Sequence, residues 1–219
     1  MKYYKVLGKG GKPCHGGTGK WHLPEDGKPG MWMPKIRKIK LCVSGYHLCR
    51  EEELLDWLNE EIYEAEGRGN SVMGENKTVF HEARLLRKCE GWNERTARLF
   101  ACDCAARVLP IYEKKYPKDD RPRNAIEAAR KYAKGEITRP EVDTAAVAAR
   151  AAAAEAAWAA AMAAARAAAM AAARDAAMAA ARDAARDAAM AAARDAARDA
   201  AWDAERKWQT QRLLEILNE

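Results

Sequence analysis

Residues 151–200 read AAAAEAAWAAAMAAARAAAMAAARDAAMAAARDAARDAAMAAARDAARDA, and 33 of these 50 positions are alanine. Alanine has the highest helix propensity of all residues, and the interspersed Arg and Met rank close behind it. No Gly or Pro occurs after Pro140. The composition therefore predicts an alanine-rich α-helix over residues 144–208.

The larger side chains in this segment recur at every fourth position, which advances each one by ~40° around a helix of 3.6 residues per turn. The row therefore winds around the helix and leaves broad alanine strips, which permit close helix–helix approach. A straight arm of ~100 Å, a folded-back hairpin and packing between protomers as a homo-oligomer all remain open. The members of the row are Trp158, Met162, Arg166, Met170, Arg174, Met178, Arg182, Arg186, Met190, Arg194, Arg198, Trp202 and Arg206.

The rest of the chain has a different composition and predicts an α+β fold with three regions. Residues 1–92 are expected to form a small α+β domain, with strands over 2–7, 35–43, 62–66 and 78–89 and one helix over 51–60. Residues 93–143 are expected to form a helical core that Asn93 caps and that Pro110 ends or kinks. A second helix is expected from Asp120 to Lys134, and a third after Pro140, capped by Asp143 or Thr144. Residues 144–219 complete the chain as the alanine-rich helix or hairpin.

The net charge of +6 lies entirely in residues 1–143, because ten basic and ten acidic residues balance from Thr144 onward. This excess is modest, so nucleic acid is not the expected partner. No apolar stretch is long enough to predict a membrane span, and the start MKYYKVLGKG lacks the apolar run of a signal peptide. A cytoplasmic location is expected, with the six cysteines as reduced thiols.

A long Gly/Pro-rich loop over residues 8–34 carries Cys14, His15, Trp21, His22 and Trp32. Cys14, Cys42, His47 and Cys49 have the residue types of a structural zinc site, although their spacing matches no standard knuckle. Burial of the thiols as small apolar groups is the competing interpretation, and it leaves the protein without a cofactor. A cysteine nucleophile, Cys14 or Cys49 with a histidine base, lacks any visible oxyanion donor, so no catalytic residue is expected. Cys102 and Cys104 would point about 200° apart on a helix, as core thiols.

Arg95–Ile137, with the run Phe100–Pro110 and the segment YPKDDRPRNAIEAAR, resembles the helical core of an immunity protein family from bacterial polymorphic-toxin loci, whose members carry an alanine-rich tail. The amino-terminal part, through Cys14 and the motif CVSGYHLC at Cys42–Cys49, is similar to an uncharacterised domain of bacterial and phage proteins. The resemblance implies a protein that neutralises a toxin or a defence effector by protein–protein contact. A metal- or ligand-binding domain with a helical oligomerisation arm is the alternative.

Trp and Arg dominate the energetics of protein interfaces. The expected contact residues are therefore Trp158, Arg166, Arg174 and Trp202 in the alanine-rich segment, or Trp21 and Trp32 in the loop.

Overall fold

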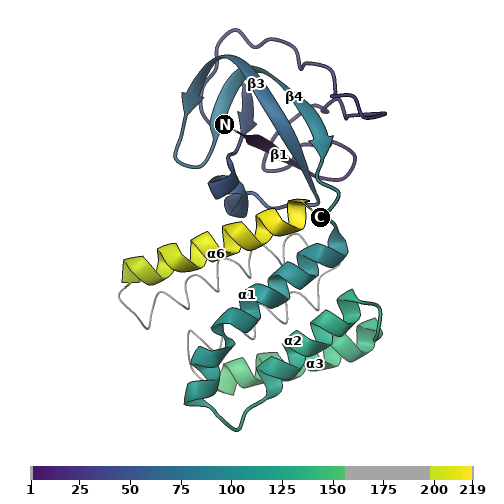
Figure 1. Ribbon diagram of the computed structural model, residues 1–219, viewed down its shortest axis with the longest axis vertical. Coiled ribbons are helices and arrows are strands. Elements are labelled where there is room, and N and C mark those ends of the chain that lie inside the picture. Colours follow the sequence, from purple (N-terminus) through teal and green to yellow (C-terminus); the bar gives the residue numbers. More distant parts are fainter. Residues whose placement is uncertain (1, 156–197, 219) are drawn as a thin grey trace. The chain divides into compact units, whose positions relative to one another are not determined.

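The computed structural model describes residues 2–155 and 198–218 and confirms the α+β fold class (Figure 1). The chain divides into two compact units. The first, the sheet unit, comprises residues 1–92 and 214–219, and the second, the helical unit, comprises residues 93–213.

The sheet unit contains one antiparallel sheet with the strand order β1-β3-β4-β2. Its strands are β1 (Tyr3–Leu7), β2 (Tyr46–Leu48), β3 (Glu61–Met73) and β4 (Thr78–Lys88). The sheet curls so far that Cys49, directly after β2, pairs with Tyr4 of β1 through backbone N–O distances of 2.7 and 2.9 Å. The first and last strands of the sheet therefore meet.

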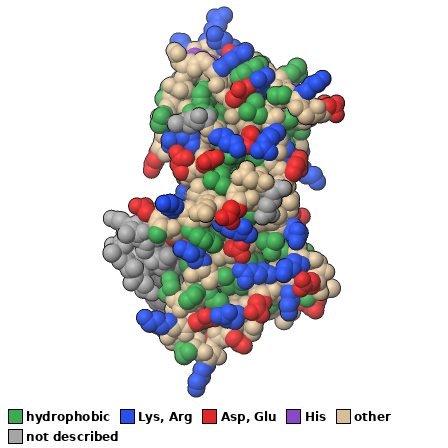
Figure 2. Space-filling model, in the orientation of Figure 1, with side chains coloured by type: hydrophobic (Ala, Val, Ile, Leu, Met, Phe, Trp, Pro, Cys, Tyr) green, Lys and Arg blue, Asp and Glu red, His purple; other side chains and the backbone are tan. Residues whose placement is uncertain are grey.

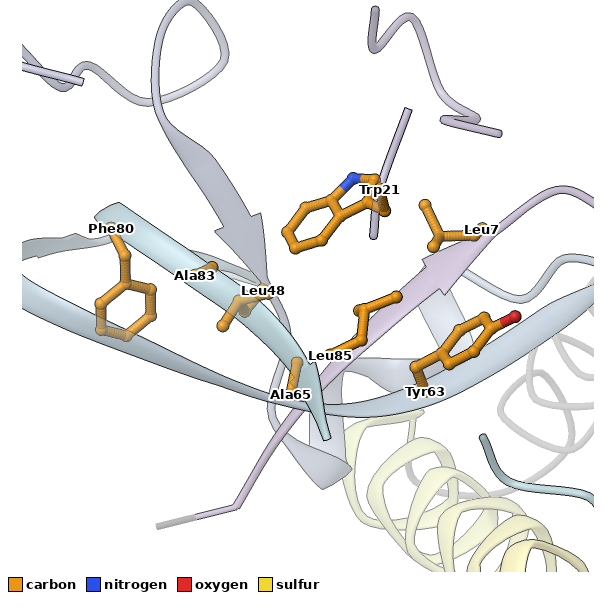
Figure 3. Packing of buried hydrophobic residues seen from close by; sticks show 8 residues of the cluster. All are labelled: Leu7, Trp21, Leu48, Tyr63, Ala65, Phe80, Ala83 and Leu85. Atoms are coloured by element: carbon orange, nitrogen blue, oxygen red, sulfur yellow. The ribbon is translucent and has the colours of Figure 1, made fainter. Parts of the chain in front are cut away.

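A hydrophobic cluster fills the concave side of this sheet (Figure 3). Trp21 enters it from the long loop and is only 6% exposed. Phe80 of β4 packs against Gly67 of β3, where an added Cβ would lie 2.3 Å from the Phe80 ring, so only glycine fits there. The buried members are Leu7, Trp21, Leu48, Tyr63, Ala65, Phe80, Ala83 and Leu85.

The strand predicted over residues 35–43 is wrong. Instead, Gly30, Met33 and Ile36 donate backbone hydrogen bonds to Leu85, Ala83 and His81 along the edge of β4, at 2.9, 2.9 and 3.0 Å. A contact at every third residue matches the three-residue turn of polyproline II, whereas a β-strand repeats every second residue. The rest of KIRKIKLCV forms no strand either, because it bends into a turn in which Lys40 and Ser44 exchange backbone hydrogen bonds at 2.8 and 2.9 Å.

Two further element predictions need correction. The helix predicted over residues 51–60 is a 3-10 helix, η1 (Glu51–Asp56), that ends earlier. The strand predicted over residues 62–66 is longer, since β3 continues to Met73. Gly69, at a φ of +83°, lies in the register shift between Arg68 and Ser71, where the extra residues leave the ladder without ending it.

The helical unit contains α1 (Glu94–Lys115), α2 (Arg121–Ala133), α3 (Arg139–Glu155) and most of α6 (Arg198–Asn218). The predicted cap of α1 is confirmed, since the Asn93 side chain accepts from the backbone N–H groups of Arg95 and Thr96 at 3.1 Å. Helix α2 lies within one residue of the predicted bounds at each end, with Gly135 at a φ of +77° after its last turn. Helices α2 and α3 lie side by side (Figure 1).

Two helix boundaries differ from the prediction. Helix α1 runs through Pro110, which lies on its exposed side, so the proline does not end the helix. Helix α3 begins at Arg139 instead of after Pro140, because proline fits the first turn of a helix. Thr138 donates from its backbone N–H and its hydroxyl to Glu141 at 2.7 and 2.8 Å, which stabilises this start.

The parts of the predicted alanine-rich helix that the structure describes, residues 144–155 and 198–208, are helical. Residues 156–197 lie outside the described residues, and with them the choice between an arm, a hairpin and an oligomer. No helix in residues 2–155 and 198–218 is long and apolar enough to cross a membrane.

Candidate functional site

The sheet unit holds a cavity of about 790 Å³ between β1, β2 and the long loop. Four predicted zinc ligands line it, namely Cys14, Cys42, His47 and Cys49, together with the predicted contact residue Trp21. Sequence reasoning therefore identified side chains that the fold brings around one space, although they are spread over 36 positions of the chain.

Three of these four side chains form hydrogen bonds with the backbone of the sheet unit. The Cys14 and Cys49 thiols donate to the carbonyl oxygens of Val6 and Tyr4 at 3.4 and 3.5 Å. His47 Nε2 accepts from the backbone N–H of Cys42 at 3.0 Å, which uses the lone pair that a metal would need. In the described part of the chain, no three His, Cys, Asp or Glu side chains form a group that could hold a metal ion.

The buried cysteines have the properties of core residues. Burial raises the pKa of Cys49 to about 12, that of Cys89 to about 11 and that of Cys102 to about 12. The pKa of Cys104 is also raised by burial. Because the thiolate is the nucleophilic form of cysteine, burial of these four thiols disfavours their reaction near neutral pH. This agrees with the expectation that Cys49 does not act as a nucleophile with a histidine base.

We expect native protein to show a sharp division of thiol reactivity. Cys42 is exposed and Cys14 is half-buried, whereas the other four cysteines are buried. Treatment with a maleimide at neutral pH should label Cys42 first and leave Cys49, Cys89, Cys102 and Cys104 unmodified for hours, as measured by peptide mass spectrometry. Unfolded protein should label at all six positions. Rapid native labelling of Cys49 would contradict the closed packing around β1 and β2.

The two loop tryptophans have different environments. Trp21 is enclosed in the hydrophobic cluster, so it is not available to a protein partner. Trp32 is half-buried between two guanidinium groups, with Arg68 and Arg84 at 4.1 and 4.7 Å from its ring centroid. Both arginines also pair with glutamates of the sheet, Glu82 and Glu66. Trp32 thus belongs to a rigid surface stack.

On the helical unit, the predicted contact residue Trp202 is half-buried on α6. Trp158, Arg166 and Arg174 lie outside the described residues. Sequence reasoning missed a cluster on α1 and α6, in which the Arg107 guanidinium lies 4.6 Å from the Trp208 ring and pairs with Glu205 at 2.5 Å. Arg107 and Glu205 are 98 positions apart, and local sequence patterns do not predict contacts at that separation.

Asp103 of α1 connects three helices. Its carboxylate accepts from Arg130 of α2 and from Arg212 of α6, both at 3.0 Å. The neighbouring residues Cys102 and Cys104 are fully buried on either side of it, as their predicted divergence requires. Helix α1 is therefore enclosed on two faces.

The segment YPKDDRPR, which carries the family resemblance, forms the link between α1 and α2. Asp119 accepts from the Tyr112 hydroxyl at 2.5 Å and from Arg121 at 2.8 Å. The Arg121 hydrogen bond holds the pKa of Asp119 well below its usual range. Arg123 and Glu113 form a second, bidentate pair across the same link at 2.7 Å. These pairs fix the angle between the two helices.

A family model described as "Imm-5 like putative immunity protein" matches residues 87–216, more than half of the chain. The chain therefore belongs to the Imm-5 like immunity protein family. The matched residues include α1, α2, α3 and nearly all of α6. No curated protein and no solved structure matches the chain.

Proposed function

We propose that this protein neutralises a protein toxin by stoichiometric binding and that the helical unit supplies the contact. The observation that carries the proposal is the family match over residues 87–216, which coincides closely with the helical unit of residues 93–213. A host defence effector is a second partner of the same kind, and it would be bound by the same surface. Of the contact residues predicted from the sequence, Trp202 lies in the helical unit and remains a candidate.

The cluster of Arg107 and Trp208 is the candidate contact surface whose side chains are best held in place on the described helices. Its guanidinium is held against the indole and by Glu205, so little side-chain freedom is lost on binding. Arginine and tryptophan are also the residue types that most often dominate interface energies. Trp202 lies on the same helix, α6, and extends the set of aromatic anchors.

Binding accounts for this site better than catalysis does. The Arg107 and Glu205 charges neutralise each other, and the nearby Cys104 thiol is buried with a raised pKa. Neither group is therefore poised as a nucleophile or a general base. Such a surface inhibits a toxin by covering it.

The test is rescue of bacterial cells that express protein toxins from polymorphic-toxin loci, each paired with the full chain. We expect growth to recover with one toxin and the two proteins to copurify in equal amounts. Trp208→Ala and Arg107→Lys should each weaken the purified complex about 10-fold or more, as interface anchors do. Arg107→Lys keeps a charge for Glu205, so the helical unit should still fold.

Arg123→Lys is the matched control, since it makes the same change at an exposed arginine paired with Glu113 elsewhere in the helical unit. It should leave affinity unchanged. Failure to rescue any toxin would contradict the proposal. So would rescue at far less than one chain per toxin with the toxin chemically modified, which would indicate an enzyme.

A further inference from the structure

Lys5 occupies a position where an unpaired charge is unexpected. Side chains alternate along β1, so Lys5 shares a face with Tyr3 and Leu7, which belong to or pack against the hydrophobic cluster. Its ammonium donates to the His47 carbonyl oxygen at 3.1 Å and lies 5.2 Å from the Trp21 ring centroid. Among the ion pairs of the described residues, none involves Lys5. A lysine in such a place normally has an anionic partner.

The other charged residues that line the cavity are also basic. Lys77 lies 4.5 Å from the Trp57 ring centroid, and Lys20, His15 and His22 line the loop side. No Asp or Glu is among the lining residues. The site therefore gathers cationic groups without a carboxylate to balance them.

These cations lie close enough to disfavour one another's charge. Burial lowers the pKa of Lys5, the Cys14 and Cys49 thiols partly oppose this, and Lys77 lowers it again. The pKa of His47 is lowered by burial and then by Lys5 and Lys77. A bound anion would relieve this repulsion, because opposite charges at short range favour the charged form of each group.

The loop wall of the cavity allows close approach of an anion to the backbone. Gly16, Gly17 and Gly19 all line the cavity, and His15 and Gly16 both have a positive φ, of 58° and 81°. A Cβ added at Gly16 or Gly19 would meet nothing within 4 Å. Bare, turning backbone of this kind is common where phosphate groups bind.

The size of the cavity and its apolar lining residues indicate more than an inorganic ion. About 790 Å³ falls within the range of about 300–1,000 Å³ that holds small organic ligands. Met33, Ile36 and Tyr46 add apolar and aromatic side chains to the lining. The cavity therefore combines basic groups with side chains suited to a flat apolar group.

We propose that the cavity of the sheet unit binds a mononucleotide, with its phosphates held by Lys5 and Lys77 and its base against Met33, Ile36 and Tyr46. A nucleic acid chain is disfavoured because the outer face of β3 and β4 carries matched Arg–Glu pairs, including Arg68–Glu82 and Arg87–Glu64, which leave no basic track. Figure 2 shows the same mixture of basic and acidic side chains over the visible surface.

Isothermal titration calorimetry of the full chain with ATP, AMP, tripolyphosphate and an eight-nucleotide single-stranded RNA tests this proposal. We expect ATP to bind, and to bind about 10-fold or more tightly than tripolyphosphate, because the base buries apolar area. Lys5→Met should weaken ATP binding about 10- to 100-fold through loss of a charge-assisted contact. Lys28→Met, at an exposed lysine outside the cavity, should bind ATP like the parent protein.

The thermal midpoint separates a ligand-binding Lys5 from a structural one. Methionine suits the apolar face of β1, so the unliganded Lys5→Met variant should melt at the same temperature as the parent or higher, while its stabilisation by ATP disappears. Absence of nucleotide binding by the parent would overturn the proposal. Equal affinity for ATP and tripolyphosphate, or binding of the RNA alone, would overturn it as well. None of these outcomes bears on toxin binding by the helical unit.

Discussion

Gly91→Ala is expected to detach the carboxy-terminal residues from the sheet unit. An added Cβ at Gly91 would lie 1.8 Å from the carbonyl oxygen of Ile216, and backbone cannot yield as a side-chain tip does. Ile216 and Leu217 are 2% and 4% exposed, and both would return to water. Burial of each stabilises by about 1.5–3 kcal/mol, so a loss of about 3–6 kcal/mol is expected.

Hydrogen exchange of the variant should show faster exchange in residues 210–218, together with a lower melting temperature. Gly135→Ala is the control, because a Cβ there meets nothing within 4 Å and only the φ of +77° is unfavourable. That change should cost about 1–2 kcal/mol and stay local to the end of α2. If the two variants lost the same stability, the close contact between Gly91 and Ile216 would not be what holds the last turn of α6 in place.

The helical elements were predictable because their signals are local. Asn93 caps α1 through its own side chain, Pro122 lies in the first turn of α2, and Gly135 takes the left-handed conformation after its end. Each of these acts within four positions of the residue concerned. Pro110 misled the prediction because a long helix held on two faces tolerates one lost hydrogen bond on its exposed side.

The cavity was only partly predictable, since long-range contacts assemble it. Cys42, His47 and Cys49 were identified as candidate ligands from their residue types. Nothing in their spacing indicated that Lys5 and Lys77 would line the same cavity. One local signal was available: Lys5 interrupts the alternating run of Tyr3 and Leu7 on the inner face of β1. The path of residues 30–36 along β4 had no such signal, because its pattern depends on which edge of the sheet is free.

Cys104→Asp should destabilise the helical unit more than any surface change. Cys104 is fully buried, and after burial Glu205 is the largest cause of the raised pKa of its thiol. Removing one carboxylate from water costs several kcal/mol when no cation pairs with it. Arg107, one turn further along α1, already pairs with Glu205 and is exposed, whereas Cys104 is fully buried. We expect a loss of about 4 kcal/mol or more at pH 7, measured by urea unfolding.

The pH dependence identifies the buried charge as the cause. Burial beside Glu205 would raise the pKa of the new carboxyl above its unfolded value of about 3.9, so the unfolded chain ionises first as the pH rises. The destabilisation should therefore be smallest below about pH 4 and should grow toward neutrality. Cys42→Asp makes the same change at an exposed cysteine with a φ of +63°, a conformation that aspartate tolerates well. It should cost no stability at neutral pH, because its carboxylate stays in water beside the basic groups of the cavity. A loss in Cys104→Asp that did not vary with pH would mean that lost packing around α1, and not the charge, causes the effect.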